Sequence, residues 1–248
     1  MLIAQVGRPR SGDLGGAVPG RACVAPSLPM IRNLAVLPCV LFLVVLCPAE
    51  VGKVESLAPL TDATVPEAVR KVLDTTGYRV VLHDGSTAAE LWLRKDVPAR
   101  TGRGEPDALY PQLAESTLIG VLHFPQASTD YRGQPIPSGF YTLRYEMMPN
   151  DGNHLGAAPS RDFVLLIPAG SDPDPNAVFT FPDLVALSRK ATSTKHPGPL
   201  NLTAASGGTP PPSVSKDDQD HFIFSAILKL ASGGDLSFGL VVKGTAPQ

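Results

Sequence analysis

The sequence predicts a mainly β protein: an antiparallel β-sandwich of immunoglobulin-like or jelly-roll type with two short helices. Three observations lead to this class. Short apolar or alternating segments recur along the chain, and Gly- and Pro-rich stretches connect them. The dipeptide Asp84-Gly85 separates two alternating segments, which is the strongest short hairpin signal present. Two short helical patterns accompany seven strand patterns, and no internal repeat is visible.

Seven segments are predicted to be strands. Segments 78–83 and 87–94 flank the Asp84-Gly85 turn and form a hairpin. Segment 117–124 is nearly all apolar, as in a strand buried on both faces, whereas 140–148 alternates as a half-buried strand does. The remaining strands are 162–168, 221–230 and 236–243, and the last two of these form a second hairpin.

Two capping-box patterns predict the helices. Thr64-Val-Pro-Glu67 begins the first helix, apolar residues at helical spacing continue it to Leu73, and Gly77 ends it. Thr180-Phe-Pro-Asp183 begins the second helix, which also has a proline in its first turn. Both helices are expected to be short.

Residues 30–49 have the pattern of a secretory signal peptide. Arg32 precedes an apolar run from Leu34 to Leu46, and Cys47-Pro-Ala49 ends it with small residues at the cleavage positions. The run is shorter than the roughly 20 apolar residues of a spanning helix. We therefore predict a secreted or periplasmic protein whose translation begins at Met30, the alternative being a long polar n-region that begins at Met1. In both cases residues 1–49 are removed, so the mature chain begins near residue 50 and has no transmembrane segment.

The mature chain, 50–248, is predicted to be a single domain with a flexible start at 50–63 and a flexible loop at 204–220. All three cysteines precede residue 50, which excludes disulfides, thiolate metal sites and a cysteine nucleophile. Four of the 21 basic and one of the 23 acidic residues lie there too, leaving a net charge of −5. An acidic chain without a Lys/Arg stripe is not expected to bind nucleic acid.

One segment carries a family resemblance. Ile136-Pro-Ser-Gly-Phe-Tyr-Thr-Leu143 resembles the P-x-G-x-Y-[ST]-L strand entry of uncharacterised small secreted bacterial β-sandwich proteins. The continuation 144–156 is similar in style to one such group. The resemblance implies the fold and bacterial export, and it implies no activity.

The densest polar cluster lies between two predicted strands, where a rigid β scaffold commonly carries binding loops. Its members are Asp151, Asn153, His154 and, close behind, Arg161. Asp151 and His154 are candidate ligands for a metal or a sugar hydroxyl, and Arg161 is a candidate partner for a carboxylate. The Asn-Asp-Gly-Asn segment equally suits an ordinary turn that binds nothing.

A second candidate is a calcium loop. Asp172, Asp174, Asn176 and Asp183 occupy the spacing of its positions 1, 3, 5 and 12, and they supply the oxygen atoms that calcium prefers. Ala177 replaces the expected glycine and Asp183 replaces the bidentate glutamate, so helix capping is the competing explanation for Asp183. The five histidines have no paired spacing, although two or three from separate strands could converge on a transition metal.

Trp92 is the candidate for stacking against a sugar ring. It shares a strand face with Glu90 and Arg94, and such neighbours predict partial exposure. A role in the core is the alternative for any aromatic side chain in a strand. No G-x-S-x-G or H-E-x-x-H motif is present, so no catalytic residue is proposed.

These patterns favour an exported, non-catalytic β-sandwich protein that binds a partner protein or a glycan in the cell envelope through the loop 150–162. The alternative is a metal-binding protein or a metal-dependent enzyme built on His154, Asp151 and other histidines. The sequence alone names no cofactor.

Overall fold

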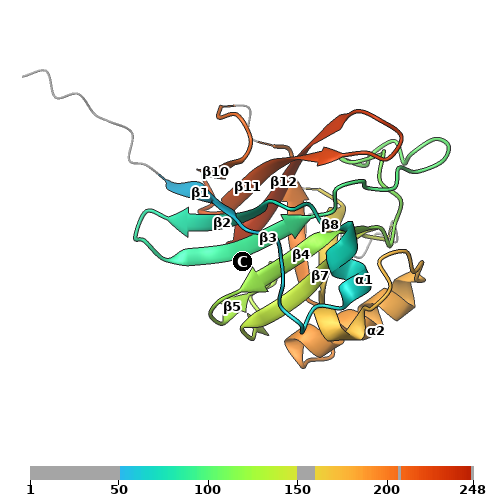
Figure 1. The fold of residues 1–248 in the computed structure, drawn as a ribbon, viewed down its shortest axis with the longest axis horizontal. Coiled ribbons are helices and arrows are strands. Elements are labelled where there is room, and N and C mark those ends of the chain that lie inside the picture. Colours follow the sequence, from blue (N-terminus) through green and yellow to red (C-terminus); the bar gives the residue numbers. More distant parts are fainter. Residues whose placement is uncertain (1–50, 150–159, 206–207, 247–248) are drawn as a thin grey trace, which may run out of the picture. The chain divides into compact units, whose positions relative to one another are not determined.

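The computed structural model describes residues 51–149, 160–205 and 208–246, and all of them belong to one compact unit, Cys47–Gln248 (Figure 1). In chain order the elements are β1 (Gly52–Leu57), α1 (Glu67–Val72), β2 (Gly77–Leu82), β3 (Thr87–Leu93), β4 (Leu118–Phe124), β5 (Ser128–Thr129), β6 (Pro135–Ile136), β7 (Gly139–Met147), β8 (Asp162–Pro168), η1 (Ala169–Ser171), α2 (Phe181–Thr192), β9 (Pro199–Thr203), β10 (Ser213–Lys216), β11 (Phe222–Lys229) and β12 (Asp235–Lys243). No helix in these ranges has the length and hydropathy needed to cross a membrane.

Ten strands form one antiparallel sheet in the order β1-β2-β3-β4-β7-β8-β9-β12-β11-β10, and β5 and β6 form a separate hairpin. Strand β9 connects the two parts of the sheet, because residues 199–201 pair with β8 and residues 202–203 pair with β12. The edge strands β1 and β10 approach each other where a Cβ on Gly52 would lie 3.3 Å from Val214 Cγ1. The sheet is therefore nearly closed, like a barrel.

Apolar side chains fill the inside of the curled sheet. On β7, Leu143 and Tyr145 join this core, whereas Thr142, Arg144 and Glu146 lie on the opposite face, as the two-residue period of a strand requires. Core residues come from both ends of the sheet, including Phe224 of β11. Side chains on the outer face are therefore the ones available for a site.

The loop between β3 and β4 packs against β9 and β12 through Tyr110. Its hydroxyl donates to the backbone oxygen of Thr203 and accepts from the backbone N–H of Gly239, which braces β9 against β12. Burial raises the pKa of Tyr110 to about 12. The buried Asp162 carboxylate accepts from the backbone N–H groups of Tyr110 and Leu109, at 3.0 and 2.8 Å, and so fixes the loop.

Both helices cover part of the outer face (Figure 1). Val69 of α1 packs with Trp92 and Val121 of β3 and β4, and Leu184 of α2 packs with Ile167 of β8. The polar outer side chains of β1 and β2 remain solvent-accessible instead. The uncovered part of the sheet, β1, β2 and the start of β3, is where a ligand can reach fixed side chains.

The mainly antiparallel β class, both hairpins and the two short helices are confirmed. The cap of α2 is also as predicted, because the Asp183 backbone N–H donates to Thr180 Oγ1 and the Thr180 hydroxyl donates to Asp183 Oδ2. The division into two sheets is not confirmed, since β9 makes the strands continuous.

Segments 50–63 and 204–220 contain β1 and β10, which are edge strands whose weak apolar pattern reflects their position at the ends of the sheet. The flexibility of both segments stays a prediction. Two predictions for the first helix are wrong. Helix α1 has Pro66 at its N-cap, and Thr64 instead donates to Asp62. The helix also ends at Val72, five residues before Gly77, which begins β2.

Candidate functional site

A row of directly opposed side chains crosses the outer face of five neighbouring strands. The register places Glu55 of β1 opposite Arg79 of β2, Arg79 opposite Glu90 of β3, Glu90 opposite His123 of β4, and His123 opposite Phe140 of β7. Directly opposed residues lie on the same face of a sheet, close enough for their side chains to interact. We call these five residues the charged row.

Short contacts connect the members of the charged row. Arg79 Nε donates to Glu90 Oε1 at 2.8 Å, and His123 Nδ1 lies 2.8 Å from Glu90 Oε2. The His123 ring stacks on Phe140 with 4.1 Å between centroids and 13° between planes. Arg79 Nη1 lies 3.8 Å from Glu55 Oε2, so this last contact is an ion pair without a hydrogen bond. Glu90 is therefore held from both sides.

The acidic members of the row are stabilised as carboxylates. Burial of Glu90, whose side chain is 13% exposed, would by itself raise its pKa, but the hydrogen bonds from His123 and Arg79 outweigh burial and lower the pKa. The hydrogen bond from Lys53 lowers the pKa of Glu55, and Arg79 lowers it further. Both carboxylates are thus ionised at neutral pH and already have cationic neighbours.

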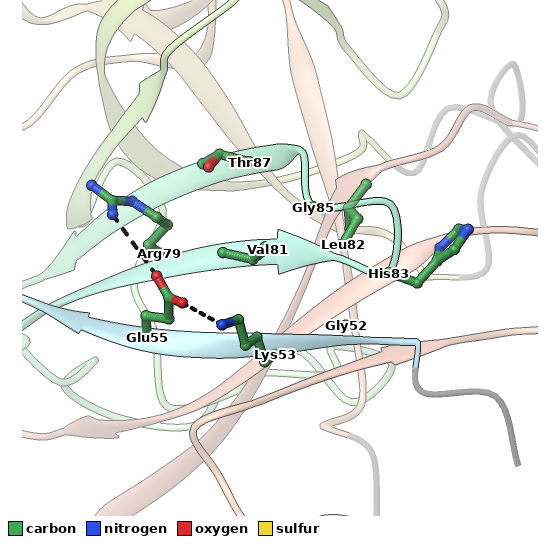
Figure 2. Close-up of a pocket in the computed structure, with 9 residues that line it drawn as sticks. All are labelled: Gly52, Lys53, Glu55, Arg79, Val81, Leu82, His83, Gly85 and Thr87. Atoms are coloured by element: carbon green, nitrogen blue, oxygen red, sulfur yellow. Dashed lines mark ion pairs between the residues drawn. The ribbon is translucent and has the colours of Figure 1, made fainter. Parts of the chain in front are cut away.

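A hollow of about 530 Å³ lies on the outer surface beside this row, between β1, β2 and the β2–β3 turn (Figure 2). Its polar lining consists of Lys53, Glu55, Arg79, His83 and Thr87. Glu55 and Arg79 belong both to the row and to the hollow, and Figure 2 shows them extending from neighbouring strands toward each other. The hollow therefore has one wall of side chains whose positions are fixed by mutual contacts.

Two other titratable clusters are centred on buried side chains, His221 and Glu146. The buried His221 ring lies between Asp217 Oδ2, 2.8 Å from Nδ1, and the Thr245 backbone oxygen, 2.9 Å from Nε2. Glu146 is also buried on the outer face of β7, and burial together with the nearby Glu115 carboxylate raises its pKa to about 8. Neither cluster lines the hollow.

Three of the sequence-predicted site residues, Asp151, Asn153 and His154, lie outside the described residues. Arg161 lies at the start of β8, where its Nε and Nη2 donate to the Met148 backbone oxygen at 3.0 and 2.7 Å. Its Nη1 donates to Asp107 at 2.6 Å. In this structure Arg161 joins two loops of the chain.

In the proposed calcium loop, arginine side chains occupy the side-chain oxygens of two of the predicted ligands, Asp172 and Asn176. Asp172 is buried, and its two oxygens accept hydrogen bonds from Arg144 Nη2 at 2.7 Å and Arg144 Nε at 2.8 Å. The Thr142 hydroxyl donates to the same carboxylate at 2.7 Å. Both oxygens of the Asp172 carboxylate therefore already accept hydrogen bonds inside the protein, and Asp172 forms a structural ion pair with Arg144.

The remaining candidate calcium ligands also point to partners within the chain. Asp174 Oδ1 accepts from the Asn176 backbone N–H, Asn176 Oδ1 accepts from Arg94 Nη2, and Asp183 Oδ2 accepts from the Thr180 hydroxyl. Within 51–149, 160–205 and 208–246, no three His, Cys, Asp or Glu side chains come together that could hold a metal ion.

The predicted exposure of Trp92 is wrong. Its side chain is 6% exposed, because the segment before α1 and α1 itself cover it. The indole Nε1 donates to the Ala58 backbone oxygen at 2.9 Å, and a Cβ on Gly77 would lie only 2.3 Å from the same nitrogen. Trp92 packs against bare backbone and offers no face for a sugar.

Sequence reasoning missed the charged row, although one signal for part of it was present. Arg79 and Glu90 lie at equal distances from the centre of the Asp84-Gly85 turn, so the predicted hairpin already places them opposite each other. The contributions of His123 and Phe140 require knowledge of strand pairing. Comparison of the chain with protein-family models, curated proteins and solved structures gave no match.

Proposed function

We propose that this chain is an exported, non-catalytic binding protein that holds a glycan in the cell envelope on the outer face of β1, β2 and β3. The observation that carries the proposal is the charged row beside the hollow. Concave surfaces with a few well-placed polar groups are typical of ligand sites. Because the side chains of the row already hold one another, binding costs less conformational entropy than it would with free side chains. The signal-peptide pattern of residues 30–49 supports the envelope location.

A polar ligand suits this surface better than an apolar protein partner does. The large hydrophobic side chains exposed among the described residues are Leu109, Val178 and Phe181, and none of them lines the hollow. Stable protein interfaces use buried aromatic and aliphatic anchors. A sugar instead presents hydroxyl groups that can pair with arginine, carboxylate and hydroxyl side chains.

Binding without catalysis is supported by the state of the two carboxylates. Glycoside hydrolysis requires one carboxylic acid whose pKa is raised so that it can protonate the leaving group. The pKa values of Glu55 and Glu90 are both lowered instead, by Lys53 and by His123 and Arg79 respectively. These groups are suited to accept hydrogen bonds and to orient their cationic neighbours.

A glycan array tests the proposal, with protein purified after expression of the full chain. We expect saturable binding to a subset of glycans and a loss of at least tenfold in affinity for Arg79→Gln. Lys229→Gln is the matched control, because Lys229 forms an exposed ion pair with Asp235 on a different hairpin and should bind as the wild type does. Binding to no glycan, or equal binding by Arg79→Gln, would refute the proposal.

A further inference from the structure

We propose that the hollow recognises an acidic sugar, whose carboxylate or sulfate group docks against the Arg79 guanidinium. This inference rests on the proposed glycan-binding function and narrows it to one class of ligand.

Arg79 has unused donors on the uncovered surface. A guanidinium has five N–H groups, and here only Nε–H donates a hydrogen bond, to Glu90. Nη1 is 3.8 Å from Glu55 Oε2, beyond hydrogen-bonding distance, and Nη2 has no hydrogen-bond partner within the described ranges. The Arg79 side chain is 40% exposed. Its two terminal amino groups therefore remain available to a ligand.

The rest of the hollow supplies side chains that can both donate and accept hydrogen bonds. The Thr87 hydroxyl and the His83 ring make no side-chain hydrogen bond within the described part of the chain. Glu55 is the single carboxylate in the lining, and its Oε1 lies 2.6 Å from Lys53 Nζ. A ligand that supplies several acceptor oxygens matches the unused N–H groups of Arg79, whereas a ligand rich in donors would leave Arg79 unpaired.

The geometry of Arg79 selects a planar or tetrahedral anion. A guanidinium presents its N–H groups as a rigid fork that pairs with two oxygens of one anion. The hydrogen bond to Glu90 fixes the plane of this fork from behind, and His123 holds Glu90 on its other side. Glu90 acts here as a positioning residue, so the anion meets an arginine whose orientation is set in advance.

Calorimetric titration of the purified protein at about 50 mM salt, where exposed charges are weakly screened, tests this inference. The probes are an oligogalacturonate and its neutral methyl ester, and a sulfated galactose oligosaccharide and its desulfated form. We expect at least one acidic probe to bind at least tenfold more tightly than its neutral counterpart. The acidic pair that shows the preference identifies the anion as carboxylate or sulfate. Raising the salt to about 500 mM should weaken only the acidic probe.

Arg79→Lys is the informative variant, because it keeps the positive charge and loses the fork. We expect the acidic preference to fall at least fivefold in Arg79→Lys and to disappear in Arg79→Gln, while Lys229→Gln keeps it. Thr87→Val probes the same hollow without touching an ion pair and should weaken the acidic probe at least threefold. Thermal melting of each variant separates loss of binding from loss of folding.

Two outcomes overturn the inference and leave glycan binding standing. One is equal affinity for the acidic and neutral members of both pairs in a protein that binds neutral glycans on the array. The other is an acidic preference that survives in both Arg79 variants, which would place the anion elsewhere. A protein that binds no glycan on the array and none of the four probes loses both the inference and the proposed function.

Discussion

Two arginines on the outer face of the same sheet have opposite surroundings. Arg144 of β7 is 1% exposed, and all five of its N–H groups have acceptors. These acceptors are the Asp172 carboxylate and the backbone oxygens of Ser116, Asp174 and Ala177. Arg79 of β2 donates one hydrogen bond, to Glu90, and remains 40% exposed.

The difference comes from what lies over each arginine. The segment from Asp172 to Phe179 wraps Arg144, and the Phe179 ring lies 5.0 Å from its guanidinium carbon. The described chain places no comparable segment over Arg79, which lines an open hollow. An arginine whose donors are all satisfied inside the protein contributes to structure, whereas one with unused donors at a concave surface has capacity for a ligand.

The largest expected effect is on stability, from removing the covered arginine. Arg144→Met leaves the buried Asp172 carboxylate without its cation, and breaking a buried pair costs about 3–5 kcal/mol. Arg79→Met removes a partly exposed pair and should cost no more than about 1 kcal/mol. Urea denaturation measures both free energies of unfolding. Equal losses for the two variants would break the comparison.

A second substitution tests the boundary between the covered and uncovered parts. In Gly77→Ala the new methyl group would lie 2.3 Å from Trp92 Nε1, so the indole must move, and overpacking of this kind costs about 1–3 kcal/mol. Trp92 is the single tryptophan of the chain, so its fluorescence reports the shift directly. Gly170→Ala is the control, because its nearest neighbour would be 3.9 Å away. An unchanged emission spectrum in Gly77→Ala would contradict the packing described.

The buried Glu146, on the covered part of the outer face, should make the stability of the protein depend on pH. Burial raises its pKa to about 8, so between its ordinary value and pH 8 the folded state holds a proton that the unfolded state has lost. The free energy of unfolding should therefore fall as pH rises from 5 to 9, with a slope of at most about 1.4 kcal/mol per pH unit. Denaturation curves at several pH values should show a flatter profile for Glu146→Gln. A wild-type free energy of unfolding that rises from pH 5 to pH 9 would contradict the raised pKa of Glu146.

Glu90 should give the smallest effect, with the opposite sign. Its pKa is lowered in the folded state, so its contribution to stability is present at neutral pH and is lost as pH falls below its ordinary value. Because the pair with Arg79 is partly exposed, the loss should be no more than about 1 kcal/mol. Glu90→Gln should remove this part of the acid dependence. Identical acid profiles for the variant and the wild type would show that the row contributes nothing to folding.

How much of this the sequence could predict depends on the separation of the contacting residues. Arg79 and Glu90 flank a tight turn, so local rules place them opposite each other. Arg144 and Asp172 are 28 residues apart, and their contact depends on how the chain returns after β8. The burial of Trp92 likewise depends on Ala58, 34 residues away. Local patterns specify hairpins and helices, whereas covering segments follow from tertiary packing.

No local pattern in the sequence indicates that the sheet is nearly closed, because this depends on pairing between strands that are distant in the sequence. Strand β9 contributes five residues, and neither its composition nor its length indicates that it pairs on both sides. An expectation of two packed sheets follows naturally from seven strong strands. The weaker strand β9 joins the two parts into one continuous sheet, and β1 and β10 extend its two edges.

The pairing of strand β9 also depends on the order in which the strands are synthesised. Its free side is completed by β12, which is synthesised more than thirty residues after β9. Until β12 arrives, β9 presents an open row of backbone groups, and such an edge invites pairing with other chains. A polypeptide that terminates before Asp235 keeps that edge permanently, so we expect truncated products to self-associate while the full-length chain does not.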